Sequence, residues 1–177
     1  MTSSSSGELA LGLLRHGTAE AGAHPQADAE RRLLPVGRDE ARRVGARALA
    51  AGYRVVAAYA SPYPRATETG ALFIEALGAR VPVMEDARLV PEASSSEASA
   101  WIQAVWRESS RALSSPLGPG LVPLLVFAAH EPILSAVASR LLGRRRPALA
   151  RAELVILGSH PSEGWREVAA LLPAGLG

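Results

Sequence analysis

The chain has 177 residues, a length typical of one domain, and 48% of them are hydrophobic. The absence of cysteine excludes disulfides, thiolate metal sites and cysteine nucleophiles. All basic residues are arginine, and acids are interspersed among them at a net charge of only +2, which argues against nucleic-acid binding. Without a basic signal region or an apolar run of ~20 residues, we expect a cytoplasmic protein with no membrane partner.

Strand and helix patterns alternate along the chain. Residues 1–7 are rich in serine and are expected to form a disordered tail before one domain over residues 8–177. Apolar runs and helical periodicity predict the following elements in order: strand 9–14, loop 19–34, helix 35–51, strand 55–60, helix 65–77, strand 81–84, helix 93–113, strand 121–129, helix 132–142, and strands 153–157 and 165–171. This order predicts an α/β fold, three-layer α/β/α, with a mostly parallel central sheet.

Polar side chains follow three of these strands. Arg15 and His16 end the first strand, Arg65 follows the second, and His130 follows the long apolar run that predicts a central strand. The carboxyl ends of parallel strands line one crevice of an open sheet. Arginine forks match phosphate oxygens, so two arginines and two histidines at this edge predict a phosphate site.

Several other polar or aromatic residues have structural explanations. Ser61 is expected to shape the turn after the second strand, and Trp101 and Trp106 to belong to the core and its rim. Glu131 either orients His130 or caps the following helix, and the cap is favoured. Residues 144–146, three arginines, are expected to be a solvated turn, with a docking patch for an acidic phosphoprotein as the alternative.

Four sequence blocks resemble the histidine phosphatase superfamily, also called the phosphoglycerate mutase-like family. Residues 14–20 (LRHGTAE) resemble its RHG signature, and residues 60–69 (ASPYPRATET) resemble its S-P-x-x-R-A-x-x-T block. Residues 129–135 (AHEPILS) resemble the block around the second histidine, and residues 33–38 (LLPVGR) resemble an L-T-x-x-G-R segment. The blocks occur in the order found in the family and extend over most of the chain.

Within the family, the short chain and the His-Glu-Pro sequence are most similar to SixA-type phosphohistidine phosphatases. Three positions depart from the family pattern. Leu34 stands where threonine is usual, Ala129 where glycine or serine is common, and Gly70 where alanine is common. Neither Ala129 nor Gly70 removes a chemical group that the reaction would use.

The resemblance implies a reaction mechanism without a metal or a cofactor. His16 would attack phosphorus in line and become a phosphohistidine, which water then hydrolyses. Arg15, Arg65 and a protonated His130 would stabilise the charge of the transferring group. The substrate-binding residues implied in this way are Arg15, Gly17, Thr18, Arg65 and His130.

The resemblance also implies a general acid among the catalytic residues. Glu92 stands at the position where the family often has a carboxylate, after the third strand. Glu85, Asp86 and Glu20 are the competing candidates for this role. An imidazole leaving group would need such an acid less than an alcohol would.

The predicted substrate is a phosphohistidine-bearing protein first and a small phosphorylated metabolite second. One alternative is a phosphoglycerate mutase-like isomerase, which the short chain disfavours. The other is a phosphate- or phosphoprotein-binding module that has lost turnover, which the presence of all four phosphate-site residues disfavours. The sequence predicts neither the pathway nor the oligomeric state.

Overall fold

A computed structural model describes residues 8–22, 28–113, 117–160 and 162–173, so the expected tail lies outside the described residues. One six-stranded sheet has the order β3-β2-β4-β1-β5-β6. The strands are β1 (Ala10–Arg15), β2 (Tyr53–Ala60), β3 (Val83–Glu85), β4 (Val122–Ala129), β5 (Leu154–His160) and β6 (Gly164–Leu171). Strands β3, β2, β4 and β1 run parallel, whereas β5 and β6 run antiparallel to their neighbours β1 and β5.

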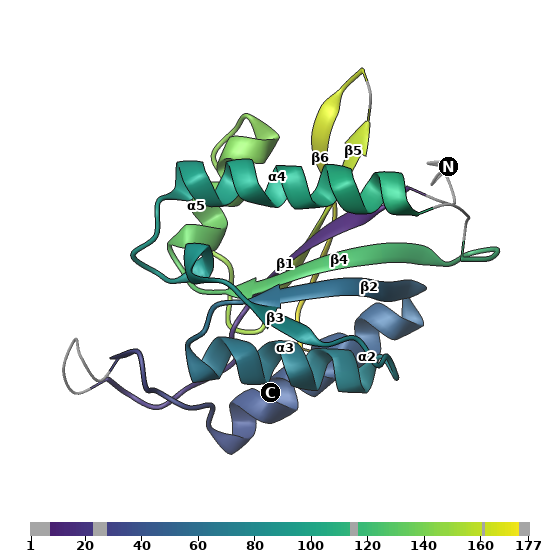
Figure 1. The fold of residues 1–177 in the computed structure, drawn as a ribbon. Helices are drawn as coiled ribbons and strands as arrows, with labels where there is room; N and C mark the ends of the chain where they lie inside the picture. Colours follow the sequence, from purple (N-terminus) through teal and green to yellow (C-terminus); the bar gives the residue numbers. More distant parts are fainter. Residues whose placement is uncertain (1–7, 23–27, 114–116, 161, 174–177) are drawn as a thin grey trace.

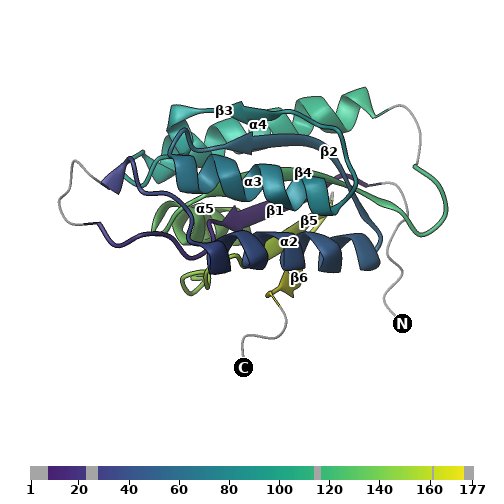
Figure 2. The same ribbon diagram turned by 90° about the horizontal axis from the view of Figure 1, so that it is seen from below.

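Helices cover both faces of the sheet (Figures 1 and 2). They are α2 (Pro35–Ala50), α3 (Pro64–Ala76), the short 3-10 helix η1 (Ala87–Leu89), α4 (Ser95–Ala112) and α5 (Ile133–Leu142). Helices α2 and α3 bury one apolar cluster against the sheet, and α4 and α5 bury the other. The predicted three-layer fold with a mostly parallel sheet is therefore confirmed. Within the described residues, none of the helices combines the length and apolarity that crossing a membrane requires.

Most elements begin or end a few residues from their predicted bounds; strand β5, for example, continues to His160 instead of ending at residue 157. Two of the differences have local reasons. Strand β3 begins at Val83, because Pro82 lacks the amide hydrogen that a strand ladder needs. Helix α4 begins at Ser95, because the hydroxyl of Ser94 accepts a hydrogen bond from the amide of Glu97 and caps the helix.

The register of the central strands sets the level at which their carboxyl ends stop. Arg15 of β1 lies opposite Ala129 of β4, and Ala60 of β2 lies opposite Ala128 of the same strand. The residues that follow these strands, His16 and His130 among them, therefore leave the sheet at one level. The carboxyl ends of β2 and β4 point towards the left in Figure 1.

Two glycines allow the loop after β1 to lie directly against helix α2. A Cβ atom on Gly37 would lie 2.0 Å from the carbonyl oxygen of Thr18, and one on Gly17 would lie 2.5 Å from the carbonyl oxygen of Gly37. The same Thr18 oxygen accepts a hydrogen bond from the amide of Leu34 at 3.0 Å. The glycine of the L-T-x-x-G-R-like segment thus has a packing role beside His16.

Gly37→Ala is expected to lower the free energy of unfolding by about 2–3 kcal/mol, because the added methyl overlaps backbone atoms that have no room to move. Gly70→Ala is the matched control, since its Cβ would meet its nearest neighbour at an ordinary 3.5 Å. The control is expected to be as stable as the wild type or up to ~1 kcal/mol more stable, because alanine favours a helix. Urea denaturation measures both, and equal stability of the two variants would contradict the packing role.

Candidate active site

The structure brings the two predicted histidines together. The rings of His16 and His130 lie with their centroids 5.1 Å apart, and the residues are only 8% and 1% exposed. The amide of His16 donates to the carbonyl of Ala129 at 3.0 Å, so the end of β1 is tied to the residue before His130. The β1–β4 ladder therefore fixes how far apart the two rings lie.

His16 has the protonation state of a nucleophile. Its Nδ1 lies 2.7 Å from the carbonyl oxygen of Gly17, which accepts a hydrogen bond only from a protonated nitrogen. Burial lowers the pKa of His16 to about 4, so the ring is neutral near pH 7. We assign the hydrogen to Nδ1, which leaves the lone pair on Nε2.

Both predicted arginines are held by their terminal nitrogens. Arg15 donates from NH1 to the carbonyl of Leu149 at 2.5 Å. Arg65 donates from NH2 to a carboxylate oxygen of Asp28 at 2.8 Å and from NH1 to the Asp28 carbonyl. The Nε atoms of both arginines are buried and have no partner among the described residues. Each arginine therefore keeps a buried donor that no described residue uses.

His130 also has unused polar atoms, and its charge differs from the expected one. Neither ring nitrogen of His130 has a hydrogen-bond partner among the described residues. Burial, followed by the positive charge of Arg65, lowers the pKa of His130 to about 2. The expected protonated His130 therefore does not describe this structure, and protonation would require a nearby anion to raise the pKa.

Sequence reasoning missed Asp28 and Arg31, which adjoin the site. Asp28 Oδ1 pairs with Arg31 NH1 at 2.7 Å while Oδ2 pairs with Arg65. Arg31 is close enough for its charge to lower the pKa values of both His16 and His130. These residues lie in a stretch without periodicity, so only their charge was visible in the sequence.

Glu92 reaches the site through Tyr63. The Tyr63 hydroxyl donates to a carboxylate oxygen of Glu92 at 3.1 Å. The Tyr63 ring lies 5.3 Å from the ring of His130, and the guanidinium carbon of Arg65 lies 5.2 Å from its centroid. Tyr63, which sequence reasoning gave no role, therefore forms one wall of the site.

The competing acids have other contacts. Asp86 caps η1 and pairs with Arg88 at 2.6 Å. Glu85 accepts from the Thr67 hydroxyl at 3.3 Å, and Glu20 accepts from the amide of Arg32 at 2.9 Å. These contacts favour Glu92 over its competitors, although its role as the acid stays a prediction.

The donors of Gly17 and Thr18 are already engaged. The amide of Gly17 donates to the Thr69 hydroxyl at 3.1 Å. The amide and hydroxyl of Thr18 donate to the two carboxylate oxygens of Glu40, at 2.7 and 2.9 Å. Their predicted contact with substrate stays a prediction, but these bonds give both residues a role in anchoring the loop beside His16.

The expected cap by Glu131 is wrong. Helix α5 begins after Pro132 without a side-chain cap, and Glu131 instead accepts from the amide of Leu149 at 3.0 Å. The carbonyl of Leu149 accepts from Arg15. The contact of Glu131 with Leu149 therefore links the segment directly after His130 to the segment that holds Arg15. The turn of Ser61 matches its prediction, with its hydroxyl accepting from the amide of Tyr63 at 3.3 Å.

The predicted solvated turn at residues 144–146 is wrong for its last arginine. The Arg146 side chain is only 8% exposed and pairs with Glu153 at 2.7 Å and with Glu167 at 3.3 Å. The carbonyl of Glu153 accepts from the amide of Arg15 at 3.0 Å, so this ion pair supports the segment beside the site.

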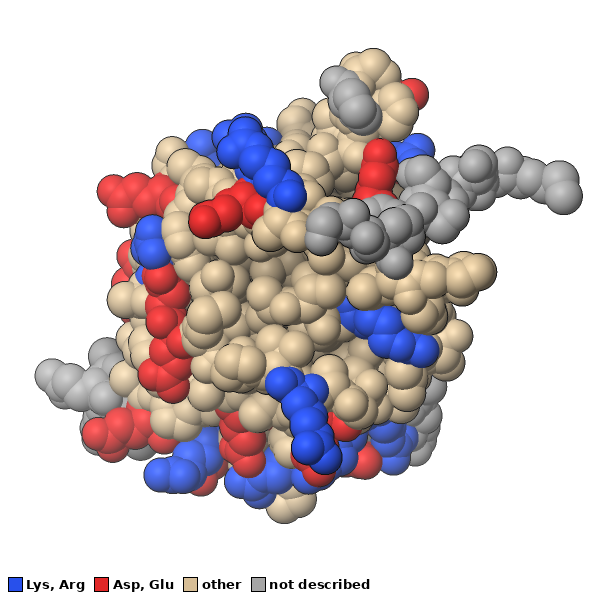
Figure 3. Space-filling view, turned by 45° about the vertical axis from the view of Figure 1, so that its right-hand side comes forward, with Lys and Arg blue, Asp and Glu red and all other residues tan. Residues whose placement is uncertain are grey.

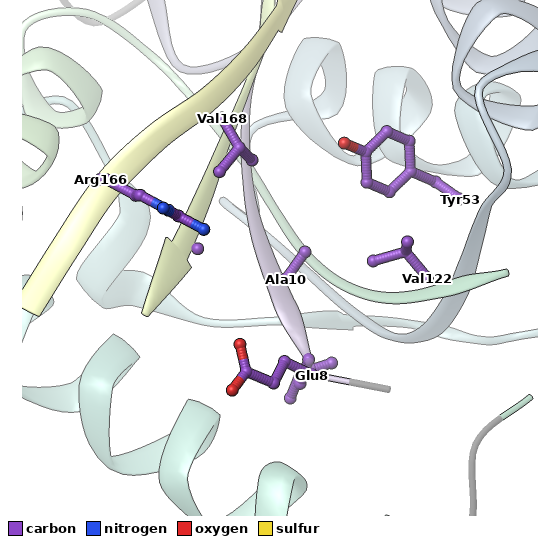
Figure 4. A pocket seen from close by; sticks show the side chains of 8 residues that line it. Glu8, Ala10, Tyr53, Val122, Arg166 and Val168 are labelled. Atoms are coloured by element: carbon purple, nitrogen blue, oxygen red, sulfur yellow. The ribbon is translucent and has the colours of Figure 1, made fainter. Parts of the chain in front are cut away.

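A separate cleft lies at the opposite edge of the sheet, around the first residues of β1, β2 and β4 (Figure 4). Glu8 and Arg166 are its charged lining residues, and it contains none of the four predicted phosphate-site residues. On the molecular face in Figure 3, acidic and basic side chains surround a largely uncharged centre. Within the described ranges, no group of three or more His, Asp or Glu is placed to hold a metal ion.

The comparisons with known proteins agree with this fold. Residues 11–91 match the model of the histidine phosphatase superfamily (branch 1). The family resemblance is confirmed. The structure is similar to that of the protein histidine phosphatase SixA complexed with tungstate, with a TM-score of 0.76 and 21% identity over 95% of this chain and 99% of that chain. No curated protein matches the chain by sequence.

Two further solved structures extend this similarity. SixA from Agrobacterium tumefaciens has a TM-score of 0.72 and 20% identity, over 94% of this chain and 99% of that one. A mycobacterial glucosyl-3-phosphoglycerate phosphatase complexed with VO3 has a TM-score of 0.68 and 19% identity, over 90% and 97%. The histidine phosphatase fold therefore extends over nearly the whole chain, including the half that contains His130.

The lowered pKa values of the two histidines predict that stability falls in mild acid. Between pH 6.5 and 4 the unfolded chain binds protons at His16 and His130 that the folded chain does not bind, so the free energy of unfolding falls as the pH falls. The loss at pH 5 relative to pH 7 is expected to be about 2 kcal/mol for each histidine. Urea denaturation at pH 7, 6 and 5 measures it.

A variant with both His16→Asn and His130→Asn is the control. Its stability is expected to change less between pH 7 and 5, because the asparagines do not titrate. The lowered pKa of Asp28 acts only in more acidic solution, so it does not obscure this range. An equal change in wild type and control would contradict the assignment of two buried, neutral histidines.

Proposed function

We propose that the chain is a metal-independent phosphatase that forms a phosphohistidine on His16. The observation that carries the proposal is a set of buried nitrogen atoms without partners around a neutral nucleophile, three of them donors when His130 is neutral and all four when it is protonated. The Nε atoms of Arg15 and Arg65 and both ring nitrogens of His130 lack partners among the described residues. Buried polar atoms are nearly always paired, so this cluster favours a ligand rich in acceptor oxygens. A phosphoryl group has that chemistry.

In the first step, Nε2 of His16 attacks phosphorus in line. The Nε2–P bond forms while the bond between phosphorus and the leaving group breaks. Arg15 and Arg65 stabilise the charge on the equatorial oxygens, and His130 donates a hydrogen bond and gains a proton more easily as the dianion raises its pKa. The Nδ1–H bond to Gly17 keeps the ring oriented and stabilises the positive charge that the attack places on it.

Glu92 would transfer the protons. As a carboxylic acid it would give its proton to the leaving group in the first step, through or beside the hydroxyl of Tyr63. In the second step, the Glu92 carboxylate would take a proton from water while the water oxygen bonds to phosphorus. The Nε2–P bond then breaks, which returns a neutral His16 and releases inorganic phosphate.

The proposed substrate is a phosphohistidine on a protein, with a small phosphomonoester as the second candidate. The similarity to two SixA structures supports the first, and the similarity to glucosyl-3-phosphoglycerate phosphatase supports the second. All three of these proteins are named as phosphatases, which favours hydrolysis over the isomerase alternative. We propose that this reaction takes place in the cytoplasm.

His16→Ala is expected to abolish hydrolysis of an aryl phosphate, because no nitrogen remains to accept the phosphoryl group. Arg65→Ala is expected to lower kcat by ~10²–10³, as the loss of one preorganised donor does in other enzymes. Steady-state assays of the purified variants measure both effects. The same assay with a phosphohistidine-labelled carrier domain compares the two substrate classes.

His160→Ala is the matched control, because His160 is a half-buried histidine at the end of β5 whose ring contacts only Ser162 among the interactions described. It is expected to retain wild-type activity. Equal rates for wild type and His16→Ala would refute the proposed mechanism, whichever substrate is used.

Glu92→Gln is expected to slow hydrolysis of an alkyl phosphate by at least ~10²-fold and that of a p-nitrophenyl ester much less, because only a poor leaving group needs protonation. Rates for a series of leaving groups measure this dependence. Glu85→Gln is the control, with no expected dependence on the leaving group. A uniform loss across the series for Glu92→Gln would assign that residue a different role.

A further inference from the structure

Asp28 places a negative charge on the arginine that is proposed to bind phosphate. Its Oδ2 atom accepts from NH2 of Arg65 at 2.8 Å, and its carbonyl oxygen accepts from NH1. The Arg65 side chain is 3% exposed and that of Asp28 is 34% exposed. A carboxylate therefore reaches from the partly open side of the site to a buried guanidinium.

The contact divides the donors of Arg65 into two sets. Asp28 accepts from the terminal nitrogens, whereas the buried Nε has no partner among the described residues. A phosphate that binds beside His130 would accept a hydrogen bond from the unpaired Nε of Arg65. It would then share the guanidinium charge with Asp28. Because both acceptors are anionic, each weakens the hold of Arg65 on the other.

Arg31 reinforces this arrangement. It pairs with the second Asp28 oxygen, Oδ1, at 2.7 Å and also donates from Nε to the carbonyl of Glu20. Both carboxylate oxygens of Asp28 thus have cationic partners, which lowers the pKa of Asp28 and keeps it ionised. The negative charge is a fixed part of the site at neutral pH.

We propose that Asp28 acts through Arg65 to weaken the binding of inorganic phosphate, the reaction product, and so speeds its release. The inference rests on the proposed function, since it assigns the product of that reaction. Asp28 is a positioning residue in this scheme, because it contacts Arg65 rather than the reacting atoms.

Asp28→Asn tests the charge with little change in shape. The asparagine oxygen still accepts from NH2 of Arg65, and the Asp28 carbonyl contact remains. Removing the charge is expected to lower the Kd for inorganic phosphate by at least about tenfold. The kcat for an aryl phosphate is expected to fall, because product release becomes slower, whereas kcat/KM is expected not to fall, because Arg65 holds the phosphoryl group of the substrate as well. Isothermal titration with phosphate and steady-state kinetics measure these values.

Two controls separate charge from shape. Asp28→Glu keeps the charge and is expected to bind phosphate close to the wild-type Kd. Glu75→Gln removes the same charge from the far end of α3, ten residues and roughly 15 Å along the helix from Arg65, and is expected to leave the Kd unchanged. Tighter phosphate binding in either control would overturn the inference.

The outcomes also separate this inference from the proposed function. If the wild type hydrolyses phosphoesters and Asp28→Asn binds phosphate no more tightly than the wild type, the Asp28 inference fails alone. If the wild type shows no hydrolysis but Asp28→Asn lowers the phosphate Kd, the proposed function fails and the role in product release fails with it, whereas the effect of the Asp28 charge on phosphate binding stands.

Discussion

The parallel pairing of β1 with β4 is the constraint on which the site depends. Arg15 lies opposite Ala129, so His16 and His130 leave two adjacent central strands at the same level. The amide of His16 then donates to the Ala129 carbonyl and extends the ladder by one bond beyond the strands. Strands buried on both faces move little, which makes the 5.1 Å separation of the rings a property of the fold rather than of a loop.

Two arginines and two histidines are buried together at this edge of the sheet, and this burial strongly lowers the pKa values of the histidines. The site keeps both histidines neutral, because desolvation and the nearby arginine charges disfavour a further positive charge. Arg15 and Arg65 remain charged, and each is secured from behind by an oxygen, that of Leu149 or those of Asp28. An anion that enters the site would meet donors already oriented, which reduces the reorganisation that binding and reaction require.

A scaffold of polar contacts surrounds these residues without belonging to the proposed chemistry. Thr69 and Glu40, from helices α3 and α2, accept from the loop after His16. The close approach of Gly17 and Gly37 allows this loop to lie directly on α2. On the other side, the buried pair of Arg146 and Glu153 supports the segment that receives Arg15. The site residues are therefore held in place by helices α2 and α3 and by the Arg146–Glu153 pair, which lie far from one another in the sequence.

The amino-acid sequence by itself determined the layered α/β fold and the meeting of His16 with His130. Hydrophobic periodicity is local, and polar residues that end parallel strands must share one edge of the sheet. Tertiary structure alone decided the partners of those residues. Three pairs show this: Asp28 with Arg65, Glu131 with Leu149, and Arg146 with Glu153. No repeating pattern of residues in the sequence relates the two members of any pair, so the sequence did not predict these contacts. The tertiary structure also decided the charge of His130. Burial and neighbouring charges set its pKa, and the residue type by itself gives neither the burial nor the neighbours.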